Sequence, residues 1–550
     1  MKPFIHYTAS PALAAAMLFA FAAKAQAVDT LRVHFPQTPI LIEREDNVLC
    51  EMRLDVRGGE TFDGVTVKFS PSPALADIES VKLFYGGTEA RNRQGLHFRP
   101  VGSYIPRDLP SHTLAAHPSY SVLQSEVHNP AAEVRLASRQ ILPEGVNYFW
   151  ISVRMKATAS IDAKISAVVA DASVGGKAVP VSIYGGTCER RMGIGVRHAG
   201  DDGAAAYRIP AFTTTLAGTL LGAYDVRRNS SADLQEAIDI GVSRSTDGGR
   251  TWEPMRIAMT FAGEGGMPAA QTGVGDPAIL VDEVTGRIWI VAAHTFGMGN
   301  ARAWNNSMPG MTGEWTAQLM MVYSDDDGQT WSTPVNITRQ VKEASWHFLL
   351  QGPGRGITMK DGTLVFPIQF IDSERIPHAG IMYSRDRGES WHITSPARSN
   401  TTEAQVAEVQ EGVLMLNMRD NRGGSRAVSV TADLGATWSE HPSNRKTLRE
   451  PVCMASLLHI GAADNATGCD LLLFSNPDTT NGRNHITVKA STDGGLTWEH
   501  AIMLDEEDGW GYSCLTLVDR ETVGILYESS VAHMTFQRVK LREILETKSE

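Results

Sequence analysis

The chain has 550 residues, more than the ~250–300 that one hydrophobic core accommodates, so we expect two or three domains. Hydrophobic residues make up 42% and charged residues 20%, an ordinary globular composition that excludes disordered and fibrous proteins. The formal charge of -12 at pH 7 argues against a nucleic-acid partner, which requires clustered lysine and arginine. The same charge also argues against an anionic substrate unless arginines are concentrated locally.

The first segment, residues 1–27, has the three parts of a secretory signal peptide. Lys2 precedes an apolar stretch over residues 11–23, and residues 24–27 read Lys-Ala-Gln-Ala. A basic start, a short apolar run and an A-x-A ending predict cleavage near Ala27 and hence a periplasmic or secreted protein. The alternative is an uncleaved N-terminal anchor. No later segment approaches the ~18 apolar residues of a membrane span, so we predict no transmembrane segment.

The cysteines give no sign of a metal or redox site. Five follow residue 27, an odd number that leaves at least one thiol free. The sequence has neither a C-x-x-C pair nor an H-E-x-x-H motif, and we predict no metal and no cofactor. Buried free thiols are the expectation, and Cys453 with Cys469 is the one pair that merits a test for a disulfide.

One pattern, S/T-x-D-x-G-x-S/T-W, recurs five times. Its copies begin at Ser245, Ser324, Ser384, Thr431 and Ser491. The spacings are 79, 60, 47 and 60 residues, with a mean of about 61. The hydroxyl and the Asp can bond nearby backbone amides, the Gly supplies a positive φ, and the Trp packs on the sheet. Each copy therefore predicts a hairpin turn with a structural role.

Short alternating apolar runs, such as residues 364–370 and 471–474, surround the repeats, and long helical periodicity is almost absent. Four-stranded units at this period predict a β-propeller, and residues 191–550 have room for six blades. Residues 28–190 lack the repeat, and alternating runs such as 148–153 predict a separate β-sandwich. That domain either binds carbohydrate or supports the propeller. The predicted fold class is all-β.

The first expected propeller strand contains Tyr207-Arg208-Ile209-Pro210. This motif and the five repeats, of the type called Asp boxes, strongly resemble the bacterial exo-α-sialidases of glycoside hydrolase family 33. The resemblance covers roughly residues 195–540. It implies a six-bladed propeller with an axial active site. Residues 28–190 resemble, more loosely, the accessory domain of some gut-bacterial sialidases. The implied partners are sialylated glycans: mucin-type glycoproteins, glycolipids and sialyllactose-like oligosaccharides.

Sialic acid carries a carboxylate on its anomeric carbon, so the implied pocket must hold an anion. The resemblance assigns this role to three arginines in different blades: Arg208, Arg419 in L-N-M-R-D, and Arg483 in G-R-N-H. Guanidinium groups suit it because they are permanently charged and bind carboxylates in a bidentate manner. Glu528, in L-Y-E, matches the acid that orients the first arginine. Such a local cluster of arginines would allow the protein to bind an anionic substrate despite its net negative charge.

The nucleophile that the resemblance implies is Tyr512, in G-Y-S-C-L, sixteen residues before Glu528. A neutral phenol avoids the repulsion between the substrate carboxylate and an incoming carboxylate. At a pKa of ~10 the phenol needs a neighbouring base. Glu403, in T-E-A-Q and sixteen residues before Arg419, matches that base.

The general acid is expected in the loop over residues 224–234. Asp233 is the best match for the residue that protonates the leaving oxygen and then activates water. Asp225 and Asp239 are the alternatives, Asp225 better suited as a partner of Arg227 and Asp239 placed within a strand.

Arg227 and Asp276, in G-D-P, resemble residues that contact the 4-hydroxyl side of the sugar, and both are alternatively turn residues. An insertion over residues 294–315 accounts for the spacing of 79 and either rims the pocket or packs as an ordinary loop. Together these residues predict an exo-α-sialidase that acts by double displacement with retention. The alternatives are a trans-sialidase or intramolecular trans-sialidase with the same residues, and a non-catalytic, glycan-binding Asp-box propeller.

Overall fold

The computed structural model describes residues 30–88, 121–184, 189–299 and 301–548, so the predicted signal peptide lies outside the described residues. Strands dominate, which confirms the predicted all-β class. The described α-helices are short: α2 (Ala303–Asn306), α3 (Thr338–Val341) and α4 (Leu541–Glu546). None of the helices in these ranges is long and apolar enough to cross a membrane.

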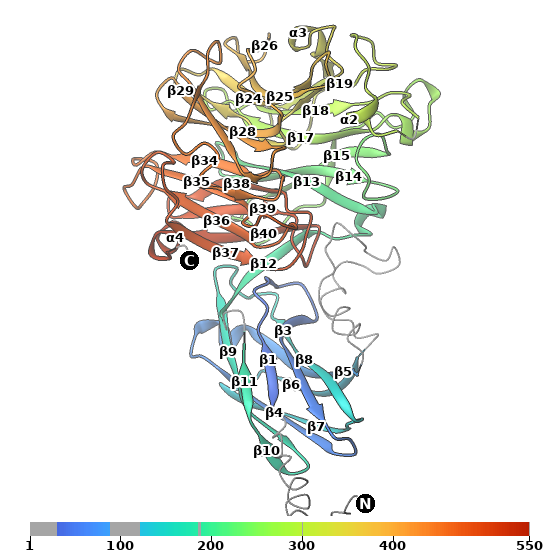
Figure 1. Cartoon of the computed structure of the whole chain (residues 1–550), viewed down its shortest axis with the longest axis vertical. Coiled ribbons are helices and arrows are strands. Elements are labelled where there is room, and N and C mark those ends of the chain that lie inside the picture. The colour runs from blue at the N-terminus through green and yellow to red at the C-terminus, as the bar shows by residue number, and fades with distance from the viewer. Residues whose placement is uncertain (1–29, 89–120, 185–188, 300, 549–550) are drawn as a thin grey trace, which may run out of the picture.

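The N-terminal part packs two sheets around one core (Figure 1, blue to cyan). Alternating side chains fill the space between them, and the Phe62 and Phe149 rings, one from each sheet, lie 4.2 Å apart. The first sheet has the order β11-β1-β3-β8-β5-β6, with strands β1 (Leu31–His34), β3 (Asn47–Val56), β5 (Ile78–Gly87), β6 (Val122–His128), β8 (Gly145–Met155) and β11 (Val181–Ile183). The second contains β2 (Ile40–Leu41), β4 (Thr61–Phe69), β7 (Glu133–Ile141), β9 (Lys164–Val174) and β10 (Lys177–Val179).

One strand, β12 (Glu189–Arg197), belongs to both parts of the molecule. Its first residues pair with β9, and its last pair with β40 (Met534–Lys540) near the C-terminus. The predicted boundary at residue 190 therefore falls inside a strand. Arg44, from the N-terminal part, donates a hydrogen bond to the carbonyl of Val531. The two parts share a continuous sheet and a buried contact.

Six mainly antiparallel sheets follow in the C-terminal part (Figure 1, green to red). The first three contain β13 (Ala206–Thr214), β14 (Leu220–Arg227), β15 (Ile238–Ser245), β16 (Arg256–Met259); β17 (Val274–Val281), β18 (Ile288–His294), β19 (Gln318–Ser324), β20 (Val335–Asn336), β22 (Gly354–Arg355); and β21 (Phe348–Gln351), β23 (Ile357–Thr358), β24 (Leu364–Ile371), β25 (Pro377–Ser384), β26 (His392–Ile393), β27 (Arg398–Ser399).

The remaining sheets contain β28 (Thr401–Gln410), β29 (Val413–Asp420), β31 (Ala427–Thr431), β32 (Ser439–Glu440); β34 (Ser456–Ile460), β35 (Leu471–Pro477), β36 (Ile486–Ser491), β37 (His500–Asp505); and β38 (Ser513–Asp519), β39 (Thr522–Tyr527), β40, which β12 extends. A small ribbon joins β30 (Gly424–Ser425) to β33 (Arg449–Glu450). Consecutive sheets touch through β13, β17, β24, β28, β34 and β38, and β38 also touches β13.

Each Asp box begins at the end of a third strand and leads toward the fourth. In the second sheet, the Ser324 hydroxyl accepts from the Gly328 amide at 2.9 Å, and Gly328 has a φ of 76°. The Asp326 carboxylate accepts from the amide of Thr330 at 2.8 Å and from its hydroxyl at 2.6 Å. The repeats therefore form turns of the kind that the sequence predicted.

The cysteines in the described ranges are all free, and Cys453 and Cys469 form no disulfide. Cys453 is buried in the C-terminal part, whereas Cys469 lies in the turn before β35 and is half-buried. The pair singled out for a test is therefore not bridged. Cys188 lies outside the described residues.

Candidate active site

A cavity of about 440 Å³ brings together residues from distant parts of the C-terminal region. Five predicted site residues line it: Asp233, Asp276, Glu403, Arg419 and Tyr512. The other four predicted residues, Arg208, Arg227, Arg483 and Glu528, contact these five as set out below. Within the described ranges, no group of three or more His, Cys, Asp or Glu side chains is arranged to hold a metal ion.

Tyr512, Glu403 and Arg419 form one hydrogen-bonded cluster. The Tyr512 hydroxyl donates to Glu403 Oε1 at 2.5 Å. Arg419 Nη1 donates to Glu403 Oε2 at 2.5 Å and to the Tyr512 hydroxyl at 3.1 Å. Burial, followed by the charge of Glu403, raises the pKa of Tyr512 well above its usual value, although Arg419 opposes the shift. The phenol is therefore neutral at rest and already bonded to a carboxylate that can accept its proton.

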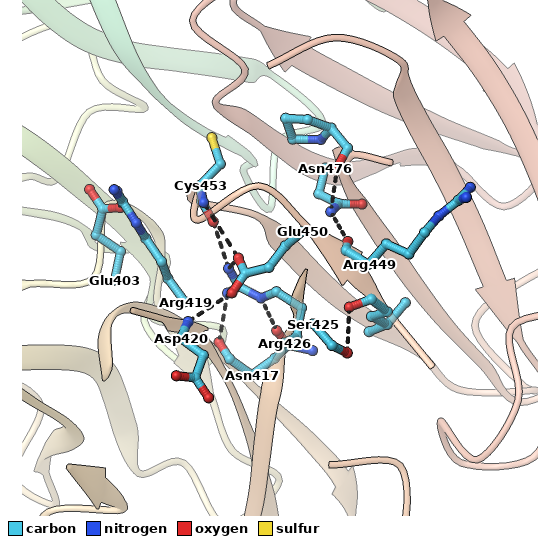
Figure 2. A network of polar contacts seen from close by, with 12 residues as sticks. Glu403, Asn417, Arg419, Asp420, Ser425, Arg426, Arg449, Glu450, Cys453 and Asn476 are labelled. Carbon is cyan, nitrogen blue, oxygen red and sulfur yellow. Dashed lines mark hydrogen bonds and ion pairs between the residues drawn. The ribbon is translucent and has the colours of Figure 1, made fainter. Parts of the chain in front are cut away.

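Arg419 is held by a buried network on and beside β29, shown in Figure 2. The carboxylate of Glu450, fully buried, accepts from the Asp420 amide at 2.7 Å and from Arg426 Nη1 at 2.7 Å. Arg426 Nε donates to Asn417 Oδ1 at 2.7 Å. Charged partners in a buried network fix the backbone firmly, and here that backbone carries Arg419.

Glu528 connects the first predicted arginine to the tyrosine. Its side chain is fully buried and accepts from Arg208 Nε at 2.7 Å, from the Ile209 amide at 2.8 Å and from the Tyr512 amide at 3.0 Å. The Arg208 guanidinium also lies 4.6 Å from the centroid of the Trp510 ring, within cation–π range. One carboxylate thus positions both Arg208 and the backbone of Tyr512.

Arg483 approaches the same tyrosine from the neighbouring sheet. Its Nη1 donates to the Trp510 carbonyl at 3.0 Å, and its guanidinium lies 5.6 Å from the centroid of the Tyr512 ring. Gly511 makes this approach possible: its φ is +84°, and a Cβ there would meet Pro477 at 2.8 Å and Arg483 at 3.1 Å. A larger residue before Tyr512 would displace the arginine or the tyrosine.

Arg227 is fully buried between two carboxylates. Its Nη2 contacts Asp225 at 2.9 Å, and its Nη1 contacts Asp233 at 2.8 Å. The Asp233 side chain is 52% exposed and lines the cavity. Burial raises its pKa, but the charges of Arg227 and Arg208 outweigh burial and lower that pKa to about 2. In the free protein Asp233 is therefore ionised.

The two alternatives to Asp233 have other partners. Asp225 is fully buried against Arg227, and burial raises its pKa to about 6. Asp239, on β15, pairs with Arg228 at 2.9 Å and accepts from Thr260 at 2.6 Å. Neither residue is among those that line the cavity.

Asp276 joins this group through its backbone. Its amide donates to Asp225 Oδ1 at 2.7 Å, and its φ is 61°. Burial and the neighbouring Asp225 charge raise the pKa of Asp276 well above its usual value. Asp276 lines the cavity with a carboxyl group whose raised pKa favours the protonated form, which can donate a hydrogen bond to a ligand.

One lining residue was not predicted, and one open alternative about the cavity wall is resolved. Gln369 is the only polar residue of β24, is 1% exposed, and neither of its amide atoms has a hydrogen-bond partner among the described residues. A lone amide in an apolar strand was the sequence signal for it. The insertion over residues 294–315 does rim the cavity, through the lining residues Arg302, Ala303, Trp304 and Asn305.

Two family models match the chain. Residues 28–178 match the N-terminal domain of BNR-repeat neuraminidase, and residues 218–525 match the BNR repeat-like domain. A sialidase of Bacteroides fragilis is 59% identical over 524 residues, which cover 94% of this chain and 96% of that protein. A sialidase of Paraclostridium sordellii is 33% identical over 60% of this chain and 82% of its own length.

Solved structures of sialidases and a trans-sialidase are also similar to this chain. The structure of a Hadza microbial sialidase, Hz136, has a TM-score of 0.89 and 62% identity, over 93% of this chain and 100% of its own. The intramolecular trans-sialidase from Ruminococcus gnavus has a TM-score of 0.53 and 21% identity, over 62% of this chain and 96% of its own, and shows a shared fold alone.

Proposed function

This chain belongs to the bacterial sialidases, glycoside hydrolases that act on sialic acid, and we propose that it is a retaining exo-α-sialidase with a tyrosine nucleophile. The observation that carries the mechanism is the 2.5 Å hydrogen bond between the Tyr512 hydroxyl and Glu403, inside the cavity. The non-catalytic glycan-binding alternative is set aside, because relatives at this identity are sialidases.

Recognition of the substrate carboxylate falls to Arg208, Arg419 and Arg483. All three guanidinium groups surround Tyr512: one donates to its hydroxyl at 3.1 Å, and the other two lie 5.5 and 5.6 Å from its ring centroid. A carboxylate bound among them sits on the carbon that the tyrosine must attack. The same arginine contacts therefore bind the carboxylate and orient the anomeric carbon toward Tyr512.

The chemistry proceeds in two displacements. In the first, Glu403 takes the Tyr512 proton while the phenolate oxygen bonds to the anomeric carbon, and Asp233 gives a proton to the departing oxygen. In the second, Asp233 takes a proton from water, whose oxygen displaces Tyr512, and the phenol regains its proton from Glu403. Two inversions at one carbon give overall retention.

Asp233 needs a proton before the first displacement. In the free protein Arg227 and Arg208 keep it ionised. An anionic substrate beside these arginines offsets part of their charge and excludes water, and both effects raise the pKa of a carboxyl group. Substrate binding therefore prepares the general acid. Arg227 and Asp276 are proposed to contact the 4-hydroxyl side of the sugar.

The architecture supports an axial site. We propose that the six sheets are the six blades of a propeller, since each contacts the next and the last contacts the first. Residues 28–190 are proposed to support this domain, because β12 and Arg44 tie them to it, and carbohydrate binding by them stays a prediction. We also propose that residues 1–27 direct export to the periplasm or medium, where glycoproteins, glycolipids and oligosaccharides carry sialic acid.

The Tyr512→Phe variant tests the mechanism. We expect the loss of more than ~10³-fold in kcat on an aryl sialoside, because the nucleophilic oxygen is gone, with unchanged thermal unfolding. Tyr323→Phe, on β19, is the matched control and should retain activity. Wild-type activity in Tyr512→Phe would contradict the assignment. NMR of the products separates free sialic acid from the anhydro or transferred sugars of the trans-sialidase alternatives.

A further inference from the structure

We propose that Arg302 selects substrates whose leaving group carries its own negative charge. The inference rests on the proposed function, because it assumes that Asp233 protonates the leaving oxygen. Arg302 lies in the insertion before the second Asp box, outside the group that binds the sialic acid carboxylate.

The position of Arg302 places it on the leaving-group side of the cavity. A general acid must come within hydrogen-bond reach of the oxygen that it protonates, so the leaving group lies against Asp233. Arg302 Nη1 is 4.0 Å from Asp233 Oδ2, and both residues line the cavity. A guanidinium here contacts the sugar that departs.

The charge of Arg302 is available to a ligand. Asp233 is its sole ion-pair partner among the residues that the structure describes, at 4.0 Å, and Asp233 already has a shorter pair with Arg227 at 2.8 Å. The Arg302 side chain is 68% exposed. An accessible, under-neutralised guanidinium at a cavity rim attracts anions.

The backbone beneath this side chain is anchored. The Ala303 amide donates to the carbonyl of Leu234, the residue after Asp233, at 2.8 Å. Within α2, the carbonyl of Asn305 accepts a hydrogen bond from Arg375 at 3.1 Å. The insertion is therefore fastened to the loop of the general acid, so that Arg302 keeps its place beside the leaving oxygen.

Two natural groups would supply the second negative charge: the carboxylate of a second sialic acid, and a sulfate ester on the neighbouring sugar. Both present oxygens that accept from a guanidinium in a bidentate manner. A neutral leaving group such as lactose offers neither. The expected substrate class is therefore sialosides with an anionic aglycone, and the two sources call for separate substrates.

The experiment compares three substrates: sialyllactose, its disialylated analogue with a sialic acid leaving group, and a form sulfated on the leaving sugar. At ~10 mM salt, where the Debye length is ~30 Å, Arg302→Gln should raise KM about fivefold for one or both anionic leaving groups. The KM for sialyllactose and all kcat values should stay within about twofold. Arg302→Lys should recover part of the difference, and at ~0.15 M salt the difference should shrink.

Arg339→Gln is the matched control: it removes the same charge from an exposed position in α3 and should change none of the three KM values. A response of the disialylated substrate alone identifies the carboxylate, and a response of the sulfated one alone identifies the sulfate. Equal KM changes for all three substrates, or none, would overturn the inference. Failure of the wild-type protein to hydrolyse an aryl sialoside would instead overturn the proposed function.

Discussion

Two sets of carboxylates in this protein have opposite surroundings. In the second Asp box, burial raises the pKa of Asp326, but hydrogen bonds from Thr330 and Ser324 together outweigh burial and lower that pKa to about 2. In the cavity, burial and the charge of Asp225 raise the pKa of Asp276 well above its usual value. An aspartate is thus a charged acceptor at this turn, whereas at position 276 in the cavity the protonated form is favoured.

The difference lies in where the partners come from. Asp326 is satisfied by residues within four positions of it, so the turn needs no other part of the chain. Glu403 meets Tyr512 across 109 residues, and Glu528 meets Arg208 across 320. Local partners make a repeated structural unit, whereas distant partners make a site that exists only in the completed fold.

Among these carboxylates, the largest effect should come from Asp233, the cavity residue proposed as general acid. Asp233→Asn should lower kcat on sialyllactose by about 10²–10⁴-fold, because the leaving oxygen loses its proton donor. An aryl sialoside with an acidic phenol needs less protonation and should lose far less. Asp239→Asn, outside the cavity, is the control. Equal losses on both substrates would remove Asp233 from the acid role.

A smaller effect is expected at Asp276, where replacing the carboxyl group should stabilise the fold at neutral pH. Its raised pKa means that the folded protein holds this proton to higher pH than the unfolded chain does. Stability is therefore lost as pH rises above ~4, the unfolded value, toward the folded pKa. Asp276→Asn avoids the ionisation, so its Tm should exceed that of the wild type by about 2–4 °C at pH 7 and match it near pH 3.

The catalytic activity of Asp276→Asn provides a second test of the protonation state of Asp276. Because asparagine still donates a hydrogen bond, we expect kcat/KM to fall by less than about tenfold when Asp276 acts as a neutral donor. Calorimetry between pH 3 and 8 and steady-state kinetics measure the two effects. A Tm that falls below the wild type at pH 7 would show that Asp276 is ionised in the folded protein.

The contrast between local and distant partners also explains what was predictable. The Asp boxes and their turns follow from short motifs, because the bonding residues are neighbours in sequence. Tyr512 and Glu403 were found through a family resemblance, and their direct hydrogen bond needed the structure. Gln369 and Arg302 belong to no motif. They become candidate site residues only because the fold places them in the cavity wall beside residues of other sheets.

The domain boundary was beyond sequence patterns for a similar reason. β12 lies before the first Asp box, which begins at Ser245, so the repeat gives no information about this strand, which extends the last sheet. Pairing of β12 with both β9 and β40 depends on the C-terminus returning to the start of the domain. The Asp-box repeat identifies the sheets of the C-terminal part, but not the strand that joins this part to the N-terminal part.

The smallest effect is expected in the turn itself. The folded pKa of Asp326, about 2, lies below the unfolded value, so its contribution to stability is full above ~pH 4 and is lost as pH falls through 2. Because solvent screens this site, Asp326→Asn should cost roughly 0.5–1 kcal/mol at pH 7. The Tm difference from the wild type should vanish near pH 2, and kcat/KM should be unchanged. A loss of activity without a loss of Tm would mean that an Asp box acts on the substrate, and the division between the two sets of carboxylates would fail.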